Sequence, residues 1–168
     1  MKLELRKVTV IASMSEETTC FTADLYIDGV KTAHVENTGK GGSHMIRDYP
    51  PGKMWDTEQK LDAYAKTLPD KKYKYNGEES TLKYDADLLV SELLTEHMQR
   101  KEFTDRLKRR VLFTCTDKPG VFQDTAKNKP SPENYERVKK CFHKYLKHIL
   151  NELPFEEAFV IYKENVDA

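Results

Sequence analysis

The sequence predicts an α+β fold in which a mainly antiparallel sheet carries about three helices packed on one face. The first fifty residues alternate apolar and polar side chains with the two-residue period of β-strands. Further along, apolar residues recur with the 3.6-residue period of helices. No repeat or low-complexity linker divides the 168 residues. We therefore expect a single domain over 1–168, β-rich over 1–50 and mixed over 51–168.

Three strands are expected in the first third of the chain. The alternation of the first strand shifts its phase at Arg6-Lys7, which indicates a β-bulge. The segments 20–27 and 30–36 flank Asp28-Gly29, a pair typical of a tight hairpin turn. A stretch rich in Gly and Pro follows over 37–54 and leaves room for a short strand.

The middle of the chain predicts a helix, a hairpin and a longer helix. The first helix is expected over 57–67. Asn76-Gly77 then indicates a second hairpin, in which we expect Tyr73 and Tyr75 to be half-buried. Apolar residues at helical spacing predict the longer helix over 85–109.

The last third predicts two strands on either side of a long helix. VLFTCT, residues 111–116, is typical of a buried strand. Ser131 followed by Pro132 is typical of a helix start, and apolar residues keep one helical face as far as Leu153. Residues 158–162 then indicate a final strand.

The charge and hydropathy of the chain argue against a membrane protein and leave any binding of a polyanion to local charge. There are 28 Lys and Arg against 28 Asp and Glu, so no overall positive field marks the molecule as a polyanion binder. No run of eighteen apolar residues can span a membrane, and charged residues interrupt the N-terminus where a signal peptide needs an apolar stretch. We expect a cytoplasmic protein without a membrane partner.

The cysteines predict neither a zinc site nor another cofactor. Cys20, Cys115 and Cys141 lie far apart, in apolar contexts and outside any CxxC pair, which favours free thiols in a reducing compartment. Cys141 lies near His143 and His148, but offsets of two and five do not share one helix face. We expect no bound metal.

The sequence favours a binding protein over an enzyme. It lacks the phosphate-binding P-loop, the GxSxG nucleophile elbow, the HExxH zinc motif and the EF-hand calcium loop. A hydrolase or transferase with an unmarked site stays open as an alternative.

A glycine-rich loop is the first candidate binding site. Its glycines allow positive φ and the close approach of an anion to backbone N–H groups, while its cations and its hydroxyl suit a phosphate. The alternative is a turn in which glycine serves geometry alone. The candidate ligand-binding residues are Gly39, Lys40, Gly41, Gly42, Ser43, His44 and Arg47.

A basic region is the second candidate. Residues 100–147 contain fourteen Lys and Arg against six acids, a net charge of +8. On the expected last helix several lysines lie near one face, where they could form a basic stripe with the end of the preceding helix. The alternative is an ordinary solvated helix face. The candidate residues are Arg106, Arg109, Arg110, Lys140, Lys144 and Lys147.

Six short segments resemble a family of small uncharacterised proteins encoded by phages and bacterial mobile elements. They are MSEET (14–18), NTGKGG (37–42), AYAKTLP (63–69), DADLLVSELL (85–94), KRRVLF (108–113) and HILNEL (148–153). The resemblance implies an accessory protein in the bacterial cytoplasm that binds, inhibits or sequesters a partner. It assigns no catalytic residue.

The sequence therefore predicts a non-enzymatic binding protein that contacts a phosphate-bearing ligand, a nucleotide or a nucleic acid, through the glycine-rich loop and the basic region. The alternative partner is a host protein, bound by an inhibitor or adaptor through an exposed apolar or aromatic surface. The oligomeric state is left open, because the apolar stripe of the last helix suits a core or a dimer seam equally.

Overall fold

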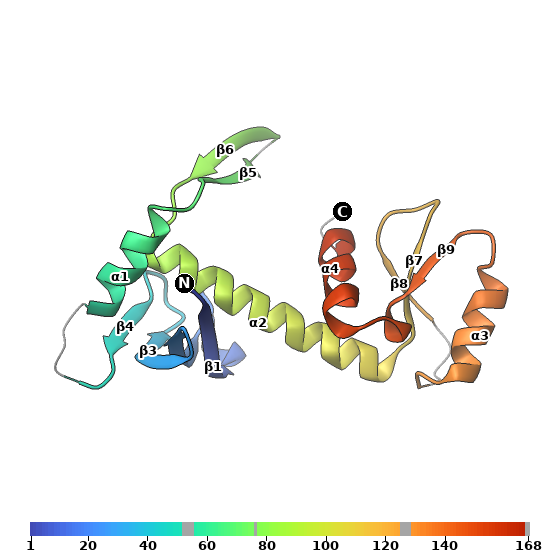
Figure 1. Ribbon diagram of the computed structural model, residues 1–168, viewed down its shortest axis with the longest axis horizontal. Helices are drawn as coiled ribbons and strands as arrows, with labels where there is room; N and C mark the ends of the chain where they lie inside the picture. Colours follow the sequence, from blue (N-terminus) through green and yellow to red (C-terminus); the bar gives the residue numbers. More distant parts are fainter. Residues whose placement is uncertain (52–55, 76, 125–128, 167–168) are drawn as a thin grey trace. The chain divides into compact units, whose positions relative to one another are not determined.

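The computed structural model describes residues 1–51, 56–75, 77–124 and 129–166. The chain forms two compact units, Met1–His97 and Met98–Ala168 (Figure 1). Both units combine helices with antiparallel strands, which confirms the α+β class. The single domain over 1–168 stays a prediction. No helix among the described residues is long and apolar enough to cross a membrane.

The first unit is built on a four-stranded antiparallel sheet in the order β1-β2-β3-β4. The expected hairpin is confirmed, since Ile27 pairs with Val30 while Asp28 and Gly29 both take positive φ. The bulge in the first strand is also confirmed, because the register shifts between Arg6 and Thr9. The strands are β1 (Leu3–Val10), β2 (Phe21–Ile27), β3 (Val30–Asn37) and β4 (Met45–Asp48), and a short 3-10 turn, η1 (Ala12–Met14), follows β1.

Two helices cover one face of this sheet. They are α1 (Asp56–Ala65) and the first turns of α2 (Ala86–Arg109). Alternate residues of β2 and β3 point into the core that these helices complete, as the two-residue period requires. The buried residues of this core are Phe21, Ala23, Leu25, Ala33, Val35, Leu61, Ala65, Ala86, Leu89, Val90 and Leu94.

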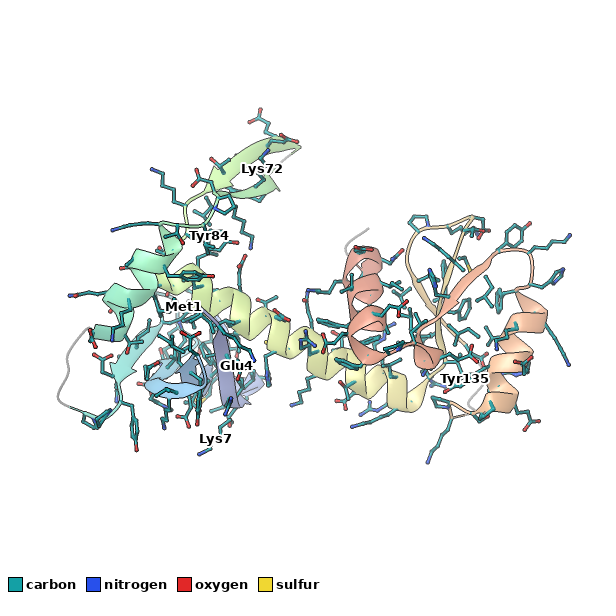
Figure 2. The ribbon with its side chains drawn as sticks, in the orientation of Figure 1. Met1, Glu4, Lys7, Lys72, Tyr84 and Tyr135 are labelled. Atoms are coloured by element: carbon teal, nitrogen blue, oxygen red, sulfur yellow. The ribbon has the colours of Figure 1, made fainter. Side chains whose placement is uncertain are left out.

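Between α1 and α2 the chain forms a two-stranded hairpin of β5 (Lys71–Tyr75) and β6 (Glu78–Leu82). This confirms the second predicted hairpin, although Asn76 of its turn and the side chain of Tyr75 lie outside the described residues. Tyr73 is 43% exposed, which is close to the expected half-burial. Within the described residues the hairpin pairs with no third strand, so no sheet covers the Tyr73 ring (Figure 2 labels the adjacent Lys72).

The second unit contains a three-stranded antiparallel sheet in the order β8-β7-β9. Alternate residues of β7 enter two different cores, because Leu112 packs with α4 and the end of α2 while Phe113 packs with α3. Helices therefore cover both faces of this sheet, whereas the sequence predicted helices on one face. The elements are β7 (Leu112–Cys115), β8 (Val121–Gln123), α3 (Pro132–Cys141), β9 (Leu146–Ile149), a 3-10 turn η2 (Leu150–Glu152) and α4 (Phe155–Val166).

The long helix predicted over 131–153 is wrong. Its start is confirmed, since Ser131 caps α3 by accepting a hydrogen bond from the Asn134 N–H. The helix ends at Cys141, however, and β9 then pairs with β7. Leu146 and Ile149, three residues apart, fit a helical stripe, but the pairing of β9 with β7 shifts register next to Leu146, so both side chains reach one core from the strand.

The final strand predicted over 158–162 is also wrong, because these residues lie in α4. Ala158, Phe159 and Tyr162 are its buried residues, and their spacing is helical. A short apolar run of this kind does not distinguish a strand from a buried helix in the sequence alone.

One side chain joins α2, β7 and η2. The Asn151 amide nitrogen donates to the Leu107 and Arg110 carbonyl oxygens, both at 3.0 Å, and its oxygen accepts from the Leu112 N–H at 2.7 Å. The last carbonyls of a helix have no partner within that helix. Asn151 satisfies one of them, that of Leu107, together with the Arg110 carbonyl just after the helix and the first N–H of the following strand.

We expect Asn151→Ala to lower the free energy of unfolding by about 2 to 4 kcal/mol, because three backbone groups lose their partner. Asn165→Ala is the control: this side chain makes one bond, to the Ile161 carbonyl within α4, and its loss should cost under about 1 kcal/mol. Urea unfolding at equilibrium measures both values. Equal losses in the two variants would contradict the role given to Asn151.

Candidate functional site

The glycine-rich loop joins β3 to β4, and the Asn37 side chain organises it. Its amide oxygen accepts from the Thr18 hydroxyl at 2.7 Å and from the Gly39 N–H at 2.8 Å. Its amide nitrogen donates to the Gly42 carbonyl oxygen and lies 3.2 Å from His44 Nδ1. One side chain therefore fixes both ends of the loop.

Three backbone donors of this loop are used inside the protein. The Gly41 N–H donates to the Thr18 hydroxyl at 3.2 Å, and the His44 N–H donates to Asp87 Oδ1 at 2.5 Å. With Gly39 bound to Asn37, three N–H groups already have acceptors. An anion could reach these three groups only by displacing those partners, so the loop resembles a structural turn more than a phosphate cradle.

The charged residues of the loop do not converge. Lys40 and Ser43 are exposed. Arg47 lies on β4 and donates to Glu36 on β3 at 2.7 Å, which neutralises it on the sheet. The structure thus brings Gly39–His44 together in one loop, but it holds Arg47 in a different hydrogen-bonded pair.

A small pocket of about 170 Å³ lies beside the loop and is acidic. Three of its carboxylates already accept backbone N–H groups, Asp62 from Ala86, Asp85 from Leu88 and Asp87 from the loop. These bonds fix the start of α2. Among the residues that the structure describes, no group of three or more His, Cys, Asp or Glu could hold a metal ion. The lining residues are Ser43, His44, Ile46, Glu58, Asp62, Asp85, Ala86 and Asp87.

His44 is held as a neutral imidazole. The Asn37 oxygen is occupied by its own donors, so its NH₂ group faces His44 Nδ1, which must accept. The proton is then on Nε2, which lies 2.8 Å from the Ser91 hydroxyl and donates to it. Burial lowers the pKa of His44, and the charge of Asp87 opposes part of that shift. In this arrangement His44 cannot take a proton from Ser91, so the pair is not a nucleophile with its base.

The basic residues predicted for one stripe lie on separate elements. Because α3 ends at Cys141, Lys144 lies in a turn and Lys147 on β9, and the stripe along a single helix is wrong. Arg110 precedes the first residue of β7, whereas Lys147 adjoins Leu146, which pairs with the last residue of β7. Arg109 and Arg110 therefore lie at one end of this strand and Lys144 and Lys147 at the other.

Arg106 is already engaged. Its guanidinium donates to the Tyr162 hydroxyl at 3.0 Å and lies 3.8 Å from a carboxylate oxygen of Glu102. This group ties α2 to α4, so we assign it a structural role.

The other end of β7 carries a cluster that we call the aromatic–basic tip. It consists of the end of α3, the turn after it, the start of β9 and the turn after β7. The Thr116 N–H joins the two turns by donating to the Tyr145 carbonyl at 2.7 Å. Phe142 and Tyr145 are 39% and 48% exposed. The residues of the tip are Lys118, Lys140, Phe142, His143, Lys144, Tyr145 and Lys147.

The lysines of the tip are exposed and, within the described parts of the chain, none has an ion-pair partner. The Phe142 ring packs on Phe113, with 4.7 Å between ring centroids, so one ring face is anchored. Neither aromatic is among the site residues predicted from the sequence, because the helical pattern over 131–153 puts both on the buried stripe. The density of aromatic and basic residues in FHKYLKH, residues 142–148, is the signal that could have found them.

No protein-family model, curated protein or solved structure matches this chain. The resemblance to phage and mobile-element proteins stays a prediction. The geometry of the site therefore carries the functional argument.

Gly39 is required by packing, and Gly42 is its matched control. Both have positive φ, near +86° and +81°, so alanine at either position should cost about 1 to 2 kcal/mol. A Cβ at Gly39 would also lie 2.1 Å from the Met14 carbonyl oxygen, whereas one at Gly42 meets open space. We expect Gly39→Ala to lose at least about 2 kcal/mol more than Gly42→Ala in urea unfolding. Equal losses would show that the loop can move away from Met14.

His44 makes stability depend on pH. Its pKa in the folded protein is lowered, so below about pH 6.5 the unfolded chain binds a proton that the folded chain does not. Stability should therefore fall as the pH falls from about 7.5 to about 5.5. We expect His44→Gln to reduce this dependence and His143→Gln, at an exposed histidine, to keep it. Urea midpoints at the two pH values measure the effect, and an unchanged dependence in His44→Gln would contradict it.

Proposed function

We propose that this protein is a non-enzymatic nucleic-acid-binding protein that uses the aromatic–basic tip. The observation that carries the proposal is that the tip contains four exposed lysines, none with an ion-pair partner in the described part of the chain, and two exposed aromatic rings. Lysines neutralise phosphates, and exposed aromatic rings stack on unpaired bases. Both contacts on one surface favour a single strand over a duplex.

The arrangement supports a polymer as the phosphate-bearing ligand. The lysines are spread over two turns, a helix end and a strand, so they suit successive phosphates along a chain rather than one nucleotide. Because the whole chain has no net charge, the attraction is local. We infer that binding is sensitive to salt and of modest affinity.

The geometry also favours binding over catalysis. The Ser91 and His44 side chains lie at hydrogen-bond distance, but the tautomer that Asn37 imposes prevents His44 from acting as the base. The carboxylates beside them accept hydrogen bonds from backbone N–H groups. These bonds hold the carboxylates in structural positions at the start of α2.

A protein partner is the second candidate, and the β5–β6 hairpin favours it. Tyr73 and Leu82 are 43% and 47% exposed. Tyr73 pairs with Ser80 and Lys71 with Leu82, so the two exposed side chains share one face of the hairpin. Binding there would tolerate moderate salt, whereas binding at the tip should not.

Fluorescence anisotropy with a labelled oligo-thymidine tests the tip. Replacing two lysines, Lys144→Gln with Lys147→Gln, should weaken binding and lower the slope of log K against log salt by about 1.4, since each phosphate contact on a single strand contributes about 0.7. Tyr145→Ala should weaken binding about 10-fold, and Tyr145→Phe should retain it because the ring stays.

The control removes the same charge elsewhere. Lys66 and Lys83 are exposed residues of the first unit, and their double glutamine variant should keep the wild-type salt slope. A wild-type slope in the Lys144 and Lys147 variant, or salt-independent binding by the wild type, would overturn the proposal.

A further inference from the structure

A second concave site lies within Met98–Ala168, away from the turns of the tip. It is a pocket of about 270 Å³ between the end of α2, the N-terminal half of α3, η2 and the start of α4 (Figure 2 labels Tyr135). Its apolar lining residues are Leu107, Leu150, Leu153 and Phe155. Ligand pockets commonly start at about 300 Å³, so this one suits a small molecule.

Two polar groups of the lining have no partner among the residues that the structure describes: the Lys108 ammonium and the Tyr135 hydroxyl. The other two polar side chains of the lining already have partners. Asn151 makes hydrogen bonds to three backbone groups, and the Thr104 hydroxyl donates to the Arg100 carbonyl at 2.7 Å. Burial and the charge of Glu152 raise the pKa of Tyr135, so its hydroxyl keeps its proton and can donate. The pocket therefore offers a cation and a hydrogen-bond donor together with apolar side chains.

The nearby carboxylates do not cancel the charge of Lys108. Glu152 accepts from Lys139 at 2.9 Å, and Glu156 next to Phe155 accepts from Arg100 at 2.9 Å. Both acids are in ion pairs, although Glu152 shares Lys139 with Glu136, and among the described residues the Lys108 ammonium has no ion-pair partner.

We propose that this pocket binds a small monocarboxylate with an apolar aliphatic or aromatic body. The carboxylate accepts from Lys108 and Tyr135, and the body packs against the leucines and Phe155. A hydrogen bond between a charged donor and a charged acceptor is about twice as strong as a neutral one, so Lys108 should discriminate against an uncharged analogue of the same shape.

Three probes of equal chain length test the proposal: hexanoate, hexanol and hexylammonium, each titrated to millimolar concentration into ¹⁵N-labelled protein and followed by NMR. We expect saturable shifts at Leu107 and Leu153 with hexanoate, about 10-fold weaker binding of hexanol, and no saturation with hexylammonium. Equal binding of hexanoate and hexanol, or no saturable shift with hexanoate, would overturn the proposal.

Variants locate the site and separate it from the tip. Lys108→Gln should reduce hexanoate binding to the level of hexanol, and Tyr135→Phe should weaken it by a smaller factor. Lys101→Gln removes an exposed charge from the same helix outside the pocket and should bind hexanoate like the wild type. Equal weakening in the Lys101 and Lys108 variants would show general charge attraction and would contradict this site.

Discussion

The hydrogen bonds of two asparagine side chains hold the irregular parts of this fold. Backbone groups that leave a helix or a sheet must find other partners, because a buried unpaired group costs about 1 to 3 kcal/mol. Asn37 provides those partners for the glycine-rich loop, and Asn151 provides them where α2 meets β7. The tautomer of His44 depends on the first of these amides, and the junction of α2 with β7 depends on the second.

The regular elements could be predicted where the pattern is local. The period of β2 and β3 and the pair Asp28-Gly29 contain the information for their hairpin, because turn and strands are adjacent in sequence. The segment after Cys141 does not contain the information that it forms a strand. There β7, some thirty residues earlier, supplies the partner that turns a helical pattern into a strand.

The candidate site also depends on residues that are distant in sequence. The glycine-rich loop was found from its composition, but its acceptors come from Thr18 and Asp87, which are distant in sequence. Which N–H groups remain open to a ligand depends on those distant residues. The basic residues were likewise found by counting, whereas the division between the two ends of β7 depends on where α3 ends.

The contact between Gly39 and Met14 also bears on how this sequence can diverge. The backbone of position 39 passes so close to the Met14 carbonyl and to Cys20 that no side chain fits, whereas position 42 has space around it. Lineages that keep this loop must retain glycine at the first position and the asparagine two residues before it, while the third glycine is free to drift toward asparagine or aspartate, which tolerate positive φ. A search pattern weighted in that way, with threonine nineteen residues before the asparagine, selects for the geometry of this loop and not for overall similarity.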